Sequence, residues 1–181
     1  MSKNRTSIYQ MLVPNNWTLK EPSASESLID TKKPIYELII DEGEQEVRIT
    51  IHNFPTNSID ERVPPEAQAA RWKQQLGGDK IIDAKTIPQS FGGYSGLRFE
   101  GIGHIGGEKL MVIGWSMQLS QEHFYALSQE HEGLTNEERE QMRGDYTIKV
   151  VGSPEKVKNL QESINRFARS FRLMQPIPDK R

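Results

Sequence analysis

Residues 111–119, MVIGWSMQL, are the stretch that decides the fold. Every second side chain from Met111 to Leu119 is large and apolar, so these side chains share one face of a strand, and the residues between them are smaller or more polar. Residues 146–150, YTIKV, repeat the alternation, with Tyr146, Ile148 and Val150 on one face. The two stretches predict two strands, each with one face in a core.

A helix is predicted directly after the second strand. Gly152 ends the strand, Ser153 is expected to cap the helix through its side-chain oxygen, and Pro154 suits the first helical position. Apolar residues then recur at helical spacing, which predicts one continuous helix with a single apolar face: Val157, Leu160, Ile164, Phe167 and Phe171. Arginines in its last turns suit the negative end of the helix dipole.

An acidic segment, residues 121–143, separates the two strands and carries six Glu against two Arg. Phe124, Tyr125 and Leu127 give it an apolar start, and Thr135 followed by Glu138 has the pattern of a capping box. We expect a short helix, a mobile acidic bend and a second helix. The chain is basic from residue 149 onward, with eight Lys or Arg against three acids. Both charged segments are typical of solvated surfaces, and a partner site is the alternative.

The rest of the chain predicts a largely antiparallel sheet packed against helices, which is an α+β fold. One helix is expected at 65–76, because Ala69, Trp72 and Leu76 share a face and Gly77 follows. Segments 20–34, 41–44 and 54–65 read as turns or loops, and the expected strands are 8–13, 17–19, 36–40, 47–51, 86–91 and 94–103. We expect one domain over residues 1–181, with the insert at about 121–143.

Composition excludes several classes of protein. The chain of 181 residues has a net charge of −2, so no overall charge favours nucleic acid. It has no cysteine, which excludes disulfides, thiolate metal sites and cysteine nucleophiles. No apolar run approaches the ~18 residues that a membrane helix needs. Residues 1–5 lack the apolar core of a signal peptide, so a cytoplasmic location is expected, or a periplasmic or exported one if a signal has been removed.

The order of motifs resembles the PsbP-like superfamily, named for a photosystem oxygen-evolving subunit. The same fold occurs in a nuclear-transport factor that binds the Ran GTPase and in small bacterial lipoproteins. The matching pieces cover most of the chain: VPNNW at 13–17, RITI at 48–51, RWKQQL at 71–76, GLRFEG at 96–101, and 146–151 followed by a glycine and a helix that ends at Ser170 and Phe171. The insert and the lack of an N-terminal lipid-attachment cysteine are departures. The resemblance implies binding or assembly rather than catalysis, and it transfers no site residues.

No group of residues has the spacing of a catalytic or metal centre. His123 and His131 lie eight apart, without the spacing of three or four that zinc ligands prefer. The glycines of 101–107 lead into another strand, so they predict a hairpin turn and not a dinucleotide loop. No serine lies in a Gly-x-Ser-x-Gly elbow. We therefore expect no catalytic residues, no metal and no cofactor, and core positions for the three tryptophans.

The candidate binding residues are Arg48, His52, Arg98 and Glu100. Arg98 and Glu100 alternate with Leu97 and Phe99, so we expect their side chains to point away from the core. If their strand pairs with the strand of Arg48 and His52, the four line a shallow polar groove. The alternative is an ordinary surface ion pair, which contributes little stability.

Two hypotheses about function follow. The first is a non-catalytic binding or assembly module, not an enzyme, that acts through an unidentified protein partner. The second is a small-molecule binder or enzyme that uses the polar groove on the sheet face. The sequence leaves the oligomeric state open.

Overall fold

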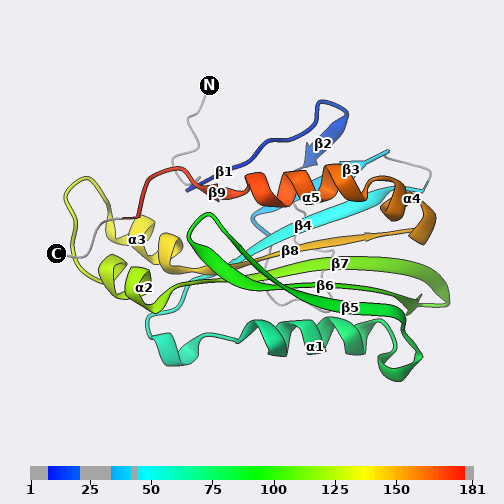
Figure 1. Ribbon diagram of the computed structural model, residues 1–181. Helices are drawn as coiled ribbons and strands as arrows, with labels where there is room; N and C mark the ends of the chain where they lie inside the picture. The colour runs from blue at the N-terminus through cyan, green and yellow to red at the C-terminus, as the bar shows by residue number, and fades with distance from the viewer. Residues whose placement is uncertain (1–7, 21–33, 42–44, 178–181) are drawn as a thin grey trace.

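The computed structural model describes residues 8–20, 34–41 and 45–177, and its main element is an antiparallel sheet of seven strands in the order β2-β3-β4-β8-β7-β6-β5 (Figure 1). The predictions for residues 1–5, for the loop over most of 20–34 and for the turn at 42–44 lie outside these ranges. The strands are β2 (Trp17–Lys20), β3 (Tyr36–Ile40), β4 (Val47–Phe54), β5 (Ile82–Phe91), β6 (Tyr94–Ile105), β7 (Glu108–Leu119) and β8 (Asp145–Gly152). A second, two-stranded sheet pairs β1 (Tyr9–Gln10) with β9 (Arg172–Leu173).

Helices cover both faces of the large sheet (Figure 1). The helix α1 (Pro65–Gln75) lies on one face, while α4 (Pro154–Asn159) and α5 (Gln161–Ser170) lie on the other. The helices α2 (Gln121–Leu127) and α3 (Asn136–Arg143) stand together at one end of the sheet, and two short 3-10 turns, η1 (Ile59–Glu61) and η2 (Gly78–Lys80), flank α1. This arrangement confirms the predicted α+β fold. None of the described helices has both the length and the apolar character that crossing a membrane requires.

The larger core lies between the sheet and α5. Register places Trp115 opposite Ile148 and Ile113 opposite Val150, so the apolar positions of β7 and β8 share this face, as the alternation predicts. Ile164 and Phe167 of α5 pack onto them, and both are at most 1% exposed. Since burying one such side chain contributes about 1.5–3 kcal/mol, this face is the main source of stability.

The smaller core lies between the sheet and α1, and two glycines make it possible. Trp72 lies on Gly114 of β7 so closely that a Cβ atom there would be 2.3 Å from the indole ring. At Gly103 of β6, a Cβ atom would be 2.1 Å from the carbonyl oxygen of Leu76. Phe99 and Val112 complete this cluster. All three tryptophans are buried, as expected, at 6% exposure or less.

Most predicted elements match, and three differ. The expected strand at 36–40 and the helix at 65–76 are confirmed, as is the capping box, in which Thr135 and Glu138 exchange both hydrogen bonds. The predicted strand at 8–13 is only β1, and the strand predicted at 86–91 begins earlier, at Ile82. The helix after Ser153 is two helices, since Leu160 leaves helical geometry at φ −95° and ψ 1°.

The prediction of a side-chain cap at Ser153 is wrong. Ser153 stands at the N-cap of α4, but its side chain makes no capping hydrogen bond. Its carbonyl oxygen instead accepts a hydrogen bond from the Val157 N–H at 3.0 Å. Local sequence identifies the cap position here, whereas the side-chain rotamer is set by the surroundings.

Candidate functional site

The predicted polar groove does not form, because its four residues lie on opposite faces of the sheet. Strands β8 and β7 separate β4 from β6. Arg98 and Glu100 pair with Trp115 and Ile113, so they face α5. Arg48 and His52 pair with Val151 and Thr147 of β8, whose side chains lie on the α1 face. Alternation could not separate a core face from a solvent face, because a helix covers each side of β6.

Arg98 and Glu100 form an ion pair beneath α5, in which Arg98 is buried and Glu100 is partly exposed. The Nη1 of Arg98 donates to Glu100 at 2.9 Å, and its Nε donates to Asn165 of α5 at 3.3 Å. The guanidinium lies 5.2 Å from the centre of the Trp115 ring, and Gln161 donates to Glu100 at 3.2 Å. The side chains that were expected to point into solvent therefore fasten α5 to β6.

Neither Arg48 nor His52 lines either of the two hollows described below. Arg48 pairs with Glu37 at 3.1 Å and with Glu46 at 3.2 Å. His52 is 6% exposed, and its ring stacks against Phe54. A binding role for these two residues, or for Arg98 and Glu100, stays a prediction.

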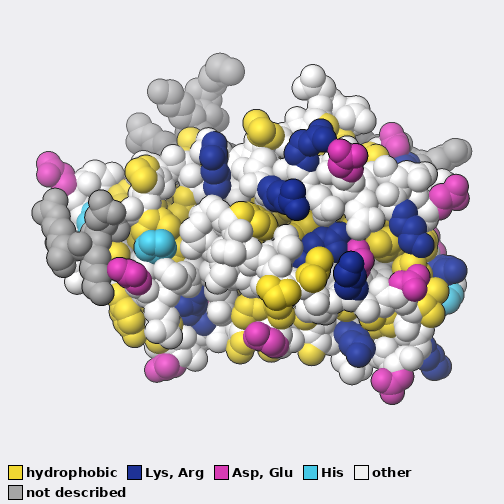
Figure 2. Space-filling model, viewed as in Figure 1, with side chains coloured by type: hydrophobic (Ala, Val, Ile, Leu, Met, Phe, Trp, Pro, Cys, Tyr) yellow, Lys and Arg dark blue, Asp and Glu magenta, His cyan; other side chains and the backbone are white. Residues whose placement is uncertain are grey.

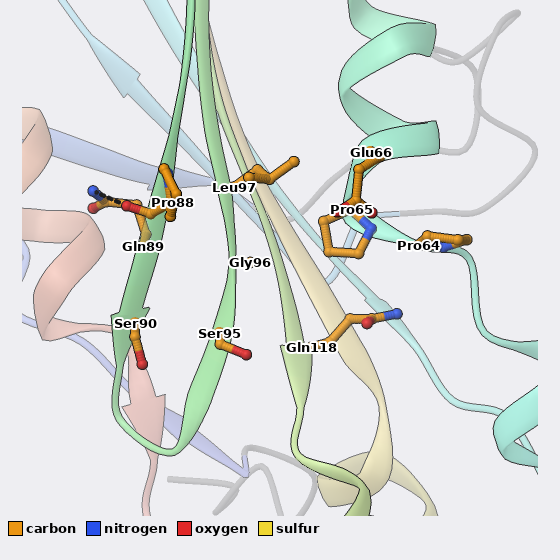
Figure 3. Close-up of a pocket in the computed structure, with 10 residues that line it drawn as sticks. All are labelled: Pro64, Pro65, Glu66, Pro88, Gln89, Ser90, Ser95, Gly96, Leu97 and Gln118. Atoms are coloured by element: carbon orange, nitrogen blue, oxygen red, sulfur yellow. Dashed lines mark hydrogen bonds between the residues drawn. The ribbon is translucent and has the colours of Figure 1, made fainter.

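Two hollows flank the first turn of α1 on the opposite face of the sheet from α5. The first, called the α1 pocket, has a volume of about 200 Å³ and is lined by α1, its preceding loop and three strands, including Phe54, Val63, Gln68, Ser116, Asp145 and Thr147. The second, called the α1 groove, has a volume of about 510 Å³ and lies between the start of α1 and strands β5 to β7. Figure 3 shows Leu97 and Gln118 of the α1 groove pointing toward Pro65, whereas Gln89 points away.

Asp145 anchors the α1 pocket but has no free acceptor position. Both of its oxygens accept from Arg62, at 2.8 and 3.1 Å. The Leu119 N–H and the Gln118 side chain donate to it as well, at 3.3 and 3.2 Å. Burial raises the pKa of Asp145 above its ordinary value, and the bonds from Arg62, Leu119 and Gln118 act in the opposite direction. A carboxylate held by four donors fixes the chain and is poorly suited to act as a general base.

Hydroxyl groups of Thr56, Ser116 and Thr147 form part of the remaining polar lining, and Glu61, Gln68 and Arg71 supply the rest. Ser116 and Thr147 are each 6% exposed and lie side by side in the register of β7 and β8. The Thr56 hydroxyl oxygen is buried and has no hydrogen-bond partner within the described part of the chain. Over these same residue ranges, no three His, Asp or Glu side chains are placed to hold a metal ion. The pocket thus offers shape and a few hydrogen bonds.

Sequence reasoning missed Arg62, Asp145 and the hydroxyl cluster. Arg62 and Asp145 are 83 positions apart, and neither belongs to a recognisable motif. Ser116 and Thr147 occupy the non-apolar positions of their strands, so the alternation correctly places them opposite the main core. Their convergence follows from strand order, for which one sequence carries no local signal.

Comparisons with known proteins agree on the architecture. No protein-family model matches the sequence, and no curated protein matches it significantly. Among solved structures, LpqN of Mycobacterium tuberculosis, which is involved in cell envelope biogenesis, is 11% identical with a TM-score of 0.57, over 96% of this chain and 88% of LpqN. The cyanobacterial PsbP of Synechocystis is 11% identical with a TM-score of 0.53, over 96% of this chain and 90% of that protein. Identity this low bears on fold and not on function. The strand order, the helices on both faces and these likenesses show that the chain has the PsbP-like fold.

Proposed function

We propose that this chain is a non-catalytic binding or assembly module that acts through a protein partner at the α1 pocket and the α1 groove. The observation that carries the proposal is the chemistry of the α1 pocket, in which apolar walls, hydroxyl groups and the side chains of Glu61 and Arg71 surround a carboxylate whose hydrogen bonds are already made. The description of LpqN as a protein of cell envelope biogenesis fits such a role.

The sizes of the hollows favour a side chain of a partner over a whole ligand. Ligand pockets usually measure about 300–1,000 Å³, and the α1 pocket has about 200 Å³. One apolar side chain can fill it, as the anchors of protein interfaces do. Val63 lines this pocket and is 59% exposed, so its side chain belongs to the surface that a partner would cover. The adjacent α1 groove can then accept the residues that follow the anchor.

The free edge of β5 favours docking through side chains over strand addition. Pro88 lies within this edge strand and has no N–H to donate to an added strand. The Gln89 side chain donates to the Pro88 carbonyl at 3.0 Å, so this acceptor is also occupied. A partner segment is therefore expected to lie across the α1 groove and not to extend the sheet.

Affinity purification with matched surface variants tests the proposal. Val63→Arg places a charge at the α1 pocket, whereas Leu19→Arg makes the same change at a residue of similar exposure, 54%, on the far edge strand β2. We expect the wild type and Leu19→Arg to enrich the same protein from an extract of the source cells, and Val63→Arg to lose it. Equal recovery by both variants, or turnover in a broad hydrolase screen, would contradict the proposal.

A small-molecule binder or enzyme is the second candidate, and one observation favours it. The volume of the α1 groove, about 510 Å³, lies within the range of ligand sites, and hydroxyls of Ser90 and Ser95 line it. The test is a thermal-shift screen of metabolites against the wild type and Leu97→Arg, which fills the groove. A ligand that stabilises the wild type and not this variant would favour the second candidate.

A further inference from the structure

A second surface lies on the opposite side of the sheet from the α1 pocket. It combines exposed arginines with exposed apolar side chains, and we call it the α5–β9 patch: Leu12, Arg166, Arg169, Arg172 and Met174. Leu12 is 76% exposed and Met174 is 56% exposed. Figure 2, in the same view as Figure 1, shows several Lys and Arg side chains over α5 and the neighbouring strands, with most Asp and Glu side chains toward the margins.

Backbone contacts hold the members of the patch together. The Leu12 N–H donates to the hydroxyl of Ser170 at the end of α5, at 2.9 Å. The Met174 N–H donates to the Ile8 carbonyl at 2.7 Å, and Arg172 pairs with Gln10 in the small sheet. Arg166 and Arg169 are three positions apart on α5, so they are neighbours on the helix surface. The patch is therefore a defined surface with a fixed backbone.

The positive charge of the patch is largely uncompensated. Arg166 pairs with Glu162 at 3.2 Å, and both side chains are more than 70% exposed, so this ion pair contributes little. Neither Arg169 nor Arg172 has an acidic partner among the residues that the structure describes.

We propose that the α5–β9 patch binds an acidic segment of a protein, in which carboxylates lie next to apolar side chains. Charge complementarity selects the carboxylates, and the planar guanidinium binds a carboxylate through two parallel hydrogen bonds. Leu12 and Met174 provide apolar contact beside the arginines, and Met and Arg are both enriched in protein interfaces.

The composition of the patch favours a protein segment over single-stranded nucleic acid. Proteins that bind single-stranded nucleic acid combine a basic groove with exposed aromatic side chains on which bases stack. Of the exposed large apolar side chains in the described residues, only Tyr125 is aromatic, and it belongs to α2 and not to the patch.

The test measures binding of a fluorescent peptide in which Glu alternates with Leu to the full chain by anisotropy. Arg169→Glu with Arg172→Glu should weaken binding by about tenfold or more, because two charge contacts become repulsive. The control, Lys73→Glu with Lys80→Glu, makes the same change of charge at exposed residues of α1 and η2 and should change the affinity less than about twofold. The double variant Leu12→Ser with Met174→Ser should also weaken peptide binding, because it removes the apolar contacts of the patch.

The outcomes separate this inference from the proposed function. Val63→Arg should leave peptide binding unchanged, because Val63 lines the α1 pocket on the other side of the sheet. No peptide binding, an equal loss in the two charge variants, or stronger binding of a single-stranded DNA oligonucleotide or of anionic phospholipid vesicles would overturn the inference. Melting curves of each variant check that the fold is retained.

Discussion

At the scale of single residues, two contacts decide how α1 and its preceding loop lie on the sheet. Gly114 lets the indole ring of Trp72 lie directly on β7. Arg62, which is held by Asp145, ties the loop before α1 to the end of β8. The first contact depends on the absence of a side chain, and the second on a buried charge with a complete set of partners. Each contact leads to a prediction whose control distinguishes the effect of that contact from the general effect of a substitution in the core.

Gly114→Ala should destabilise the fold by about 1–3 kcal/mol, because the added methyl group would be 2.3 Å from the Trp72 ring. For a chain of this length the melting temperature falls by about 2–4 °C for each kcal/mol. The control is the same substitution in a Trp72→Leu background, where the smaller side chain leaves room for the methyl group. Gly114→Ala should cost clearly less there, and an equal cost in both backgrounds would exclude this contact as the cause.

The stability of the wild type relative to Asp145→Asn should fall as the pH rises above 3.8. Burial raises the folded-state pKa of Asp145 above this value, so within that window the folded state binds more protons than the unfolded state. The contribution of Asp145 is therefore fully present below the unfolded-state pKa and declines as the pH rises through the folded-state pKa. Chemical denaturation of both proteins across acidic pH measures the difference. A difference that grows with pH would show that the bonds from Arg62 outweigh burial.

The sequence predicts the polarity of single residues better than their direction. The alternation over 111–119 correctly placed Trp115 in the core, because large apolar residues fill one face of β7 without interruption. At Arg98 and Glu100 the same reasoning failed. Phe99 also lies in a core, the one beneath α1, and a helix covers both faces of β6. Alternation cannot show which face an ion pair occupies when neither face is simply solvent.

At the scale of elements, the acidic insert is more than a surface loop. Phe124 of α2 is 2% exposed and belongs to the main core, together with Leu127 and Met142 of α3. The guanidinium groups of Arg62 and Arg143 lie 5.3 and 5.5 Å from the centre of the Phe124 ring. Residues 128–133, in contrast, are exposed except for the half-buried His131. The two parts of the insert should respond differently to change.

Deletion of residues 129–133, closed with a short glycine linker, should shift the melting temperature by only a few degrees. The deleted residues bury little surface, and α2 and α3 fix the ends of the loop. The deletion removes the contact between the His131 ring and the Ala126 carbonyl. A loss of cooperative unfolding would show that the bend belongs to the core.

Phe124→Ala should destabilise the fold by about 3–5 kcal/mol, because it empties a core position and removes the ring beneath two arginines. Tyr125→Ala is the matched control. The ring of Tyr125 is 57% exposed, so its removal should reduce stability much less. Chemical denaturation of both variants gives the comparison. Similar losses would mean that α2 packs differently.

Local sequence predicts the helices well where a cap or a breaker marks them. Thr135 with Glu138 marks the start of α3, and Gly77 follows α1 with a φ of 118°. The interruption at Leu160 carries no such mark, because Leu is a good helix former and the apolar spacing continues through it. Val157 and Ile164, on either side of Leu160, are both fully buried. The apolar spacing therefore predicts the buried face that α4 and α5 share, but it does not predict the break between them.

At the scale of the whole molecule, the sheet separates two surfaces of different chemistry. The α1 side has two hollows lined by apolar residues and by charges of both signs, and the α5 side has the arginines and exposed apolar residues of the α5–β9 patch. Neither surface could be derived from the sequence, because each combines elements that are remote along the chain, such as Leu12 with Ser170. An assembly role needs two such surfaces if the chain is to bring partners together.

The edge strand β5 is the place where two copies of the chain could pair edge to edge. A two-residue turn, Gly92 and Gly93 with φ of 64° and 83°, closes β5 onto β6, so Phe91 and Tyr94 form a hydrogen-bonded pair. Alternation along the ladder then directs the backbone groups of Ser90 and Pro88 outward. Pro88 removes a donor from that outer edge, and Gln89 occupies the Pro88 carbonyl. Proline at this position is a known means of keeping edge strands apart.

Pro88→Thr should therefore promote association between copies of the chain. The substitution restores an outward N–H on a ten-residue edge strand and adds a residue that favours strands. Light scattering over a concentration series measures the effect, with a higher average mass expected for the variant than for the wild type. Ser90→Thr is the control, because it adds the same β-branched side chain on the same strand but no new donor. A rise in mass with Ser90→Thr as well would assign the effect to strand propensity, and an unchanged mass with Pro88→Thr would show that other features of β5 keep its edge free.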